Sequence, residues 1–118
     1  MKYLCLIYED EKWWDKASEA DMQKGMAEYN ACTESIKKNG NYVGGEALQP
    51  TKTAKAVRVR NGKISATDGP YVETKEQLGG YYLITAKDLN DAVQVASRIP
   101  GAKHGTVEVR PIMEFDQP

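Results

Sequence analysis

The sequence is poor in the residues that most often bind metals or carry out nucleophilic chemistry. It contains one histidine, His104, and two cysteines, Cys5 and Cys32. Zinc sites of the usual kinds need several His and Cys ligands at short spacings, which do not occur here. The glycine pairs at 44–45 and 79–80 are too short to be phosphate-binding loops. We therefore predict no cofactor and no metal, and we favour buried, reduced thiols over a disulfide.

The chain also lacks a large excess of positive or negative charge and a long apolar segment. The chain has 16 basic and 17 acidic residues and a pI near 5.9, which gives no reason to expect nucleic acid or an anionic membrane as a partner. No apolar run approaches the about 20 residues that cross a bilayer. The first 14 residues lack the longer apolar stretch and the cleavage site of a signal peptide. We predict one domain over residues 1–118, in a cytoplasmic protein.

The first third of the chain indicates a strand followed by a helix. Residues 2–8, KYLCLIY, are apolar on both faces, as in a central strand. Ser18 is a typical helix N-cap, and Gly40 is a typical helix end. Between them runs an apolar stripe at helical spacing, made of Met22, Met26, Tyr29, Thr33 and Ile36. Trp13 and Trp14, in the polar connection before this helix, fit a pocket mouth or partner surface as well as they fit a core position.

The rest of the chain adds three strands, a hairpin and a second helix. Residues 41–48 predict a strand that bulges or bends at Gly44–Gly45. Asn61–Gly62 predicts a type I′ turn between strands at 54–60 and 63–67. A two-sided apolar strand at 79–86 follows, and then a helix capped by Asp88 and stopped by Pro100–Gly101. That helix carries an apolar stripe of Leu89, Ala92, Val93, Ala96 and Ile99, and a last strand includes Val107 and Val109.

This order of elements predicts an α+β fold of the ferredoxin-like, split β-α-β kind, with an inserted hairpin and one antiparallel sheet. Both helices would cover the same face of the sheet. Strands 2–8 and 79–86 are apolar on the second face as well, and a bare apolar face of that size is an association surface. We therefore expect a homodimer in which two sheets pack face to face as a dimeric α+β barrel.

The stretch TDGPYVETKEQLGGYYLI, residues 67–84, joins the hairpin to a central strand. Asp68–Gly69–Pro70 is typical of a turn. Thr74 and Gln77 have the spacing of a capping box, which predicts a one-turn helix at 75–78. These features have structural explanations, whereas the charges at Glu73, Lys75 and Glu76 do not follow from them.

The same stretch resembles the signature of the DGPF-domain family, with Tyr71 where the family name has Phe. GNYVGGEALQP, DLNDAVQVASRIPGA and GTVEVRPI also fit, so that the resemblance covers nearly the whole chain. This family belongs to the YCII-related superfamily, and the resemblance implies a ferredoxin-like fold in a dimeric α+β barrel. It also implies an association with alternative sigma factors, beside which some members are encoded. Related YCII proteins are credited with a His–Asp pair whose His lies in the first helix; this helix has no His, although Asp68 is present.

Charged residues near the second sheet face are the candidate site. Glu108 and Arg110 share one face of the last strand and form either a structural ion pair or an acid–base and anion-binding group. The candidate catalytic residues are Asp68 and Glu108. The candidate substrate-binding residues are Arg110, Glu73, Lys75 and Glu76, although acids near a turn are often only solvated and Lys75 also fits an ion pair with Glu73.

Two functional hypotheses follow. The first is a dimeric small-molecule protein that catalyses cofactor-free proton transfer, as an isomerase or lyase, in a carboxylate/Arg pocket between sheet faces. The second is a non-catalytic ligand-binding or regulatory module associated with sigma-factor signalling, which rests on the family resemblance alone. A purely structural dimer without a ligand-sized pocket is the third option.

Overall fold

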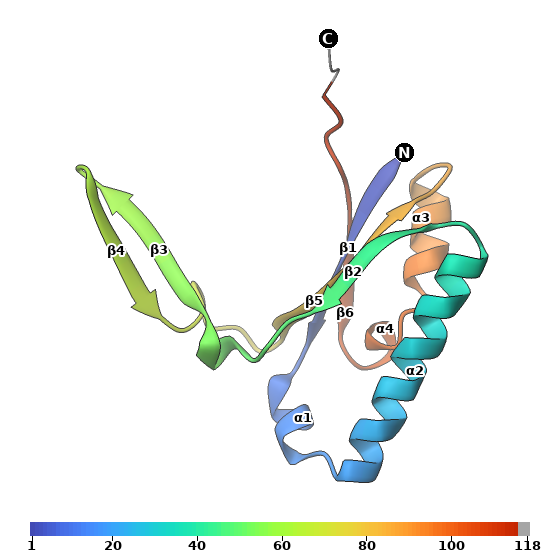
Figure 1. Ribbon diagram of the computed structural model, residues 1–118, viewed down its shortest axis with the longest axis horizontal. Helices are drawn as coiled ribbons and strands as arrows, with labels where there is room; N and C mark the ends of the chain where they lie inside the picture. Colours follow the sequence, from blue (N-terminus) through green and yellow to red (C-terminus); the bar gives the residue numbers. More distant parts are fainter. Residues whose placement is uncertain (116–118) are drawn as a thin grey trace.

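The computed structural model describes residues 1–115 of the chain (Figure 1). Six strands, four α-helices and one 3-10 turn occur within these residues. In chain order they are β1 (Lys2–Glu9), α1 (Glu11–Lys16), α2 (Glu19–Lys38), β2 (Tyr42–Ala47), η1 (Thr51–Thr53), β3 (Lys55–Arg60), β4 (Lys63–Asp68), β5 (Gln77–Thr85), α3 (Leu89–Ala96), α4 (Gly101–His104) and β6 (Thr106–Pro111).

Four strands form an antiparallel sheet in the order β2-β5-β1-β6. With β3 and β4 set aside, this is the strand order of the split β-α-β plan, so the predicted ferredoxin-like α+β fold is confirmed. The helices lie on one side of this sheet (Figure 1). None of the helices in the described part of the chain is long and apolar enough to cross a bilayer.

The core lies between this sheet and the helices. Its largest fully buried side chains come from β1, β5, α2 and the α3 region: Tyr3, Cys5, Ile36, Ile84, Val95 and Ile99. Cys5 and Cys32 are both buried free thiols, as expected. No helix of the described residues lies on the opposite face of the sheet. There the register pairs Leu4 with Leu83, Leu6 with Tyr81 and Tyr8 with Leu78, all half-buried in a single chain.

The inserted hairpin forms a separate two-stranded sheet, β3–β4, that projects away from the main sheet (Figure 1). Its turn is the predicted one, because Asn61 and Gly62 both have positive φ, of 50° and 74°. The predicted bulge in β2 is also present, since the register against β5 shifts between Tyr42 and Gly44.

The predicted one-turn helix at 75–78 is wrong. Thr74 and Gln77 do interact, but Gln77 Nε2 donates to the Thr74 carbonyl at 2.6 Å and the Thr74 hydroxyl donates to the Glu76 carbonyl. Gln77 is already the first residue of β5 and pairs with Glu9 of β1. The pairing with β1 therefore outweighs the local capping-box spacing.

The helix predictions need three further corrections. The connection that contains Trp13 and Trp14 is a short helix, α1, capped by the Asp10 carboxylate. Helix α3 ends at Ala96, before Pro100–Gly101, which instead begins α4. Ala92, Ala96 and Ile99 of the predicted stripe are buried, together with Val95, which the stripe did not include. Leu89 and Val93 of that stripe are about half exposed.

Candidate functional site

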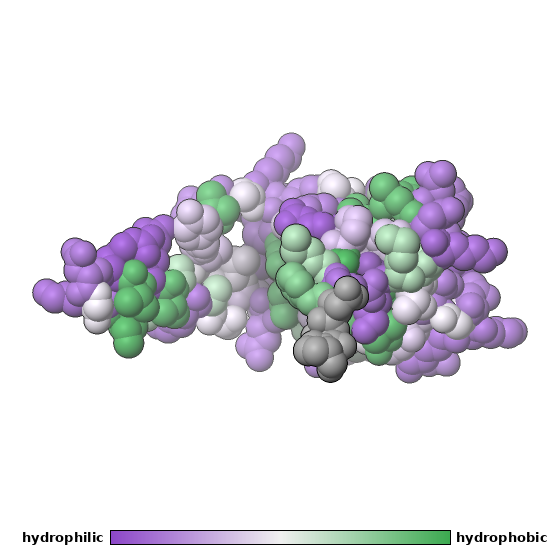
Figure 2. All heavy atoms as spheres, turned by 90° about the horizontal axis from the view of Figure 1, so that it is seen from above, coloured by the Kyte–Doolittle hydropathy of each residue, from purple (hydrophilic) through white to green (hydrophobic). Residues whose placement is uncertain are grey.

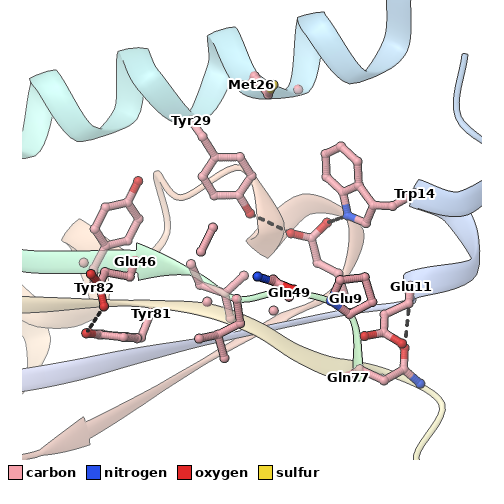
Figure 3. Close-up of a pocket in the computed structure, with 18 of the residues that line it drawn as sticks. Glu9, Glu11, Trp14, Met26, Tyr29, Glu46, Gln49, Gln77, Tyr81 and Tyr82 are labelled. Carbon is pink, nitrogen blue, oxygen red and sulfur yellow. Dashed lines mark hydrogen bonds between the residues drawn. The ribbon is translucent and has the colours of Figure 1, made fainter. Parts of the chain in front are cut away.

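A cavity of about 590 Å³ lies between α1, the N-terminal half of α2 and the ends of β1, β2 and β5 (Figure 3). We call it the α2 pocket. It lies on the helix side of the sheet, whereas Glu108 and Arg110 project from the other side. Its principal lining residues are Ile7, Glu9, Glu11, Trp14, Met22, Met26, Tyr29, Thr33, Glu46, Leu48, Gln77 and Tyr82.

Small residues in the strands provide the space for this pocket. Gly45, Ala47, Gly79 and Gly80 line it from β2 and β5. The facing part of α2 therefore has little to pack against. Met22 and Met26, which the helical stripe predicts to be buried, are 43% and 62% exposed. The stripe faces the sheet only in its second half and faces the pocket in its first half.

The main polar group of the pocket is the carboxylate of Glu9 at the end of β1 (Figure 3). The Tyr29 hydroxyl on α2 donates to Glu9 Oε1 at 2.6 Å. The indole Nε1 of Trp14 on α1 donates to Glu9 Oε2 at 3.1 Å. A carboxylate oxygen has two acceptor sites, so each oxygen of Glu9 keeps one for a ligand. Three elements thus meet at one half-buried carboxylate.

Two glycines allow this close approach. A Cβ on Gly101, at the start of α4, would lie 2.7 Å from the Tyr29 hydroxyl and 2.9 Å from Glu9 Oε1. A Cβ on Gly25, in the middle of α2, would lie 2.7 Å from the Trp14 ring. Both distances are shorter than a carbon atom tolerates, so larger residues at either position would push the donors away from Glu9.

The pocket tyrosines remain neutral donors at ordinary pH. Burial, together with the hydrogen bond to Glu9 and its charge, raises the pKa of Tyr29 well above that of a free phenol. Burial also raises the pKa of Tyr82, whose hydroxyl lies 2.7 Å from Thr33 Oγ1. Tyr29 therefore stays protonated and donates a hydrogen bond to the Glu9 carboxylate.

A second carboxylate, Glu11, connects the pocket to the hairpin. Its oxygens accept hydrogen bonds from the Thr51 backbone N–H and the Thr51 hydroxyl, both at 2.7 Å. The Glu11 backbone N–H donates to Gln77 Oε1 at 2.9 Å. Thr51 precedes β3 and Gln77 follows β4, so Glu11 fixes both segments that lead to the hairpin.

The pocket lining is acidic. It includes Glu9, Glu11, Asp15 and Glu46, and no Lys, Arg or His among the residues that the structure describes. Within residues 1–115 no group of three or more His, Cys, Asp or Glu is arranged to hold a metal ion. The arrangement suits a ligand with an apolar body and a positively charged or hydrogen-bond-donating group.

The candidate residues from the sequence lie outside this pocket. Asp68, at the end of β4, forms an exposed ion pair with Lys55. Glu108 and Arg110 share one face of β6, as predicted, and form an ion pair with each other. Glu73 and Lys75 are exposed in the loop before β5, and Glu76 accepts a hydrogen bond from the Thr106 hydroxyl at 2.9 Å. The structure brings Glu108 and Arg110 together but places Asp68 on a different sheet.

The sequence contained a signal for Glu9 that the motif-based reasoning missed. Tyr3, Cys5 and Ile7 are the buried face of β1, and Glu9 is the next residue with the same parity. A carboxylate that continues a buried face requires hydrogen-bonding partners. Its partners, Trp14 and Tyr29, come from segments whose approach to β1 depends on the fold.

Comparison with known proteins gives a family but no established activity. The family model of the YCII-related domain matches residues 1–116. An uncharacterized protein of Rhizobium meliloti is 33% identical over 114 residues, which covers 95% of this chain and 92% of that protein.

Proposed function

The chain belongs to the YCII-related domain family, and we propose that it binds a small, largely apolar molecule in the α2 pocket. The group of the ligand that faces Glu9 is a hydrogen-bond donor or a cation. The observation that carries this proposal is the Glu9 carboxylate, held by Tyr29 and Trp14 with acceptor capacity to spare. The volume of about 590 Å³ lies within the roughly 300–1,000 Å³ typical of small-molecule sites.

The charge of the lining supports the proposed ligand class. An anionic ligand would meet the Glu9 carboxylate, further acidic residues and no base among the described lining residues. Like charges about 4 Å apart repel by about 1 kcal/mol in water and several-fold more at a partly buried site. An ammonium or a neutral N–H or O–H group would gain a charge-assisted hydrogen bond instead.

We propose cofactor-free proton transfer as the chemistry of this site, in an isomerase or a lyase. Glu9 accepts a proton from a C–H or N–H bond of the ligand. In an isomerase the same carboxyl group returns that proton to another atom of the ligand; in a lyase the electron pair expels a leaving group. The Tyr29 and Trp14 hydrogen bonds hold the carboxylate in position.

A second proposal is a non-catalytic ligand-binding or regulatory module. It is favoured by the two hydrogen bonds that hold the Glu9 carboxylate in one position, because a fixed carboxylate with one acceptor site left on each oxygen can bind a ligand without any proton transfer. The association with sigma factors remains a proposal based on the family resemblance.

We also propose that two copies pack through the helix-free face of the sheet. Its centre is apolar, with Leu4, Leu6 and Leu83, and the Glu108–Arg110 ion pair lies at its β6 edge. In such a dimer, Asp68 of one copy would lie near β6 of the second copy only if the hairpin of the first copy packed against that second copy. A joint site of Asp68 and Glu108 therefore remains a prediction for the interface.

A ligand screen with matched chemistry tests these proposals. Apolar amines and alcohols should raise the melting temperature, and apolar carboxylates of the same size should not. Glu9→Gln should weaken amine binding by about 10- to 100-fold, the cost of one charge-assisted hydrogen bond. Glu108→Gln, outside the pocket, should bind as the wild type does. Preferential binding of carboxylates, or unchanged amine binding by Glu9→Gln, would refute the pocket assignment.

Hydrogen–deuterium exchange of bound ligand protons, followed by NMR, separates catalysis from binding. Exchange that requires Glu9 supports proton transfer at the α2 pocket. Exchange lost in Asp68→Ala and Glu108→Ala but retained in Glu9→Gln would instead support a site at the interface. Binding without exchange supports the regulatory module.

A further inference from the structure

The β3–β4 hairpin presents an apolar face that no residue within 1–115 covers. The register places Val57 opposite Ala66 and Val59 opposite Ile64 on this face. Val57, Val59 and Ile64 are 63%, 57% and 77% exposed. Figure 2 shows an apolar patch on the projecting hairpin, beside strongly hydrophilic side chains.

The other face of the hairpin is polar. It carries Arg58 opposite Ser65 and Arg60 opposite Lys63. Arg58 lies over the ring of Tyr71, 5.2 Å from its centroid. The hairpin is therefore two-sided, with a basic face suited to water and an apolar face suited to burial.

We propose that this apolar face packs against a second copy of the chain, so that each hairpin clasps the partner. This inference rests on the dimer proposed above and adds to it. An isolated two-stranded hairpin is at best marginally stable in water. This one projects from the sheet (Figure 1), with its base tied to α1 through Glu11 and Thr51. The base of the hairpin is thus held in place, and its exposed apolar face is free to pack against a second copy.

The contact area supports a second copy as the occupant. Four strands of about six residues present a face of roughly 400 Å², about half of the roughly 800 Å² per partner of a standard interface. The hairpin face adds roughly 200 Å², and the partner's hairpin covers a similar area in return. Sheet and hairpin together therefore reach the size of a stable interface, whereas the sheet face alone does not.

Charge complementarity points the same way. Residues 51–68 contain five basic residues and one acid, Asp68, and so carry a net charge of +4. Because the whole chain is −1, the rest of the chain carries −5. A basic hairpin that reaches over an acidic body is attracted to a second copy. Asp68 shares the apolar face, at its base, so this arrangement also brings that acid to the interface.

Sedimentation equilibrium over a wide range of concentrations tests the clasp. The double variant Val59→Glu/Ile64→Glu places two charges on the apolar face. The matched control, Ser65→Glu/Thr67→Glu, places the same charges on the polar face. We expect the wild type and the control to be dimers with similar Kd, and the apolar-face variant to have a Kd at least about a hundredfold higher.

The outcomes separate the clasp from the dimer itself. If both variants dimerise as tightly as the wild type, the clasp is refuted and the sheet-face dimer stands. If the wild type is monomeric throughout, both the clasp and the sheet-face dimer are refuted. If the apolar-face variant does not fold, hydrogen exchange of the wild-type protein tests the clasp instead. Hairpin amides must lose protection as dilution dissociates the dimer, and equal protection at all concentrations overturns the clasp.

Discussion

Removal of the Tyr29 hydroxyl tests whether the Glu9 carboxylate is a junction that holds the pocket together. In Tyr29→Phe the 2.6 Å hydrogen bond to Glu9 Oε1 is lost, while the ring still packs between α2 and the sheet. A hydrogen bond to a charged group contributes about 1.5–3 kcal/mol. The free energy of unfolding should fall by that amount.

The chain offers a matched control. Tyr81 also donates to a carboxylate, Glu46 Oε2, but at 3.2 Å and in an exposed position. Tyr81→Phe should change the free energy of unfolding by less than about 0.5 kcal/mol, as exposed substitutions usually do. In urea denaturation at equal protein concentration, Tyr29→Phe should lower the midpoint by roughly 1 M with an unchanged slope. Equal shifts for the two variants would show that burial does not strengthen the bond to Glu9.

The pH dependence of this difference provides a second check. The folded-state pKa of Tyr29 is raised, so its stabilisation is complete below the pKa of an unfolded phenol, about 10. Above that pH the unfolded chain loses the proton first. The wild type should then lose stability relative to Tyr29→Phe by about 1.4 kcal/mol per pH unit. A gap between the two proteins that stays constant from pH 10 to about pH 11 would contradict the raised pKa.

Two further predictions concern close packing and the buried thiols. Gly101→Ala should lower the free energy of unfolding by about 1–3 kcal/mol and weaken ligand binding, because the new Cβ would collide with Tyr29. The control is Gly44→Ala, because the space around a Cβ at Gly44 is open. This control should change neither the urea midpoint nor ligand binding. Burial raises the pKa of Cys5 from 9.0 to about 11 and also raises the pKa of Cys32. A disulfide-exchange reagent at pH 8 should therefore react with both thiols only as the protein unfolds. Rapid reaction of either thiol in the folded protein would show that the burial is incomplete.

The sequence predicts the elements whose signals are local. Ser18 caps α2, and its hydroxyl accepts from the Asp21 N–H at 3.1 Å. Asp88 caps α3 in the same way. Asn61–Gly62 fixes the hairpin because this pair favours the type I′ turn, whose twist matches that of the two strands. Each of these signals depends on two to four adjacent residues, which the rest of the fold does not change.

The failures occur where tertiary contacts outweigh local patterns. Helix α1 has six residues, too few for a helical period to be recognised. The capping-box spacing of Thr74 and Gln77 is real, but β5 begins at Gln77 because β1 offers it a partner. The α2 stripe has the right period, yet it does not reveal that the sheet lacks large side chains opposite Met22 and Met26.

The small residues of the sheet opposite the first half of α2 leave the α2 pocket open, and a binding site and a packing defect are the two explanations for this space. Close packing is the rule in domain cores, and missing side-chain volume lowers stability. Here Gly45, Ala47 and Gly80 supply little volume where the floor of the pocket lies. The carboxylate of Glu9 at one end of this space would be costly without Tyr29 and Trp14. Ligand binding after the floor is filled distinguishes the two explanations. Ala47→Leu should leave the free energy of unfolding unchanged or raise it in either case, because it fills empty space. It should abolish ligand binding only if the pocket is a binding site, and unchanged binding of the amines and alcohols would contradict that assignment.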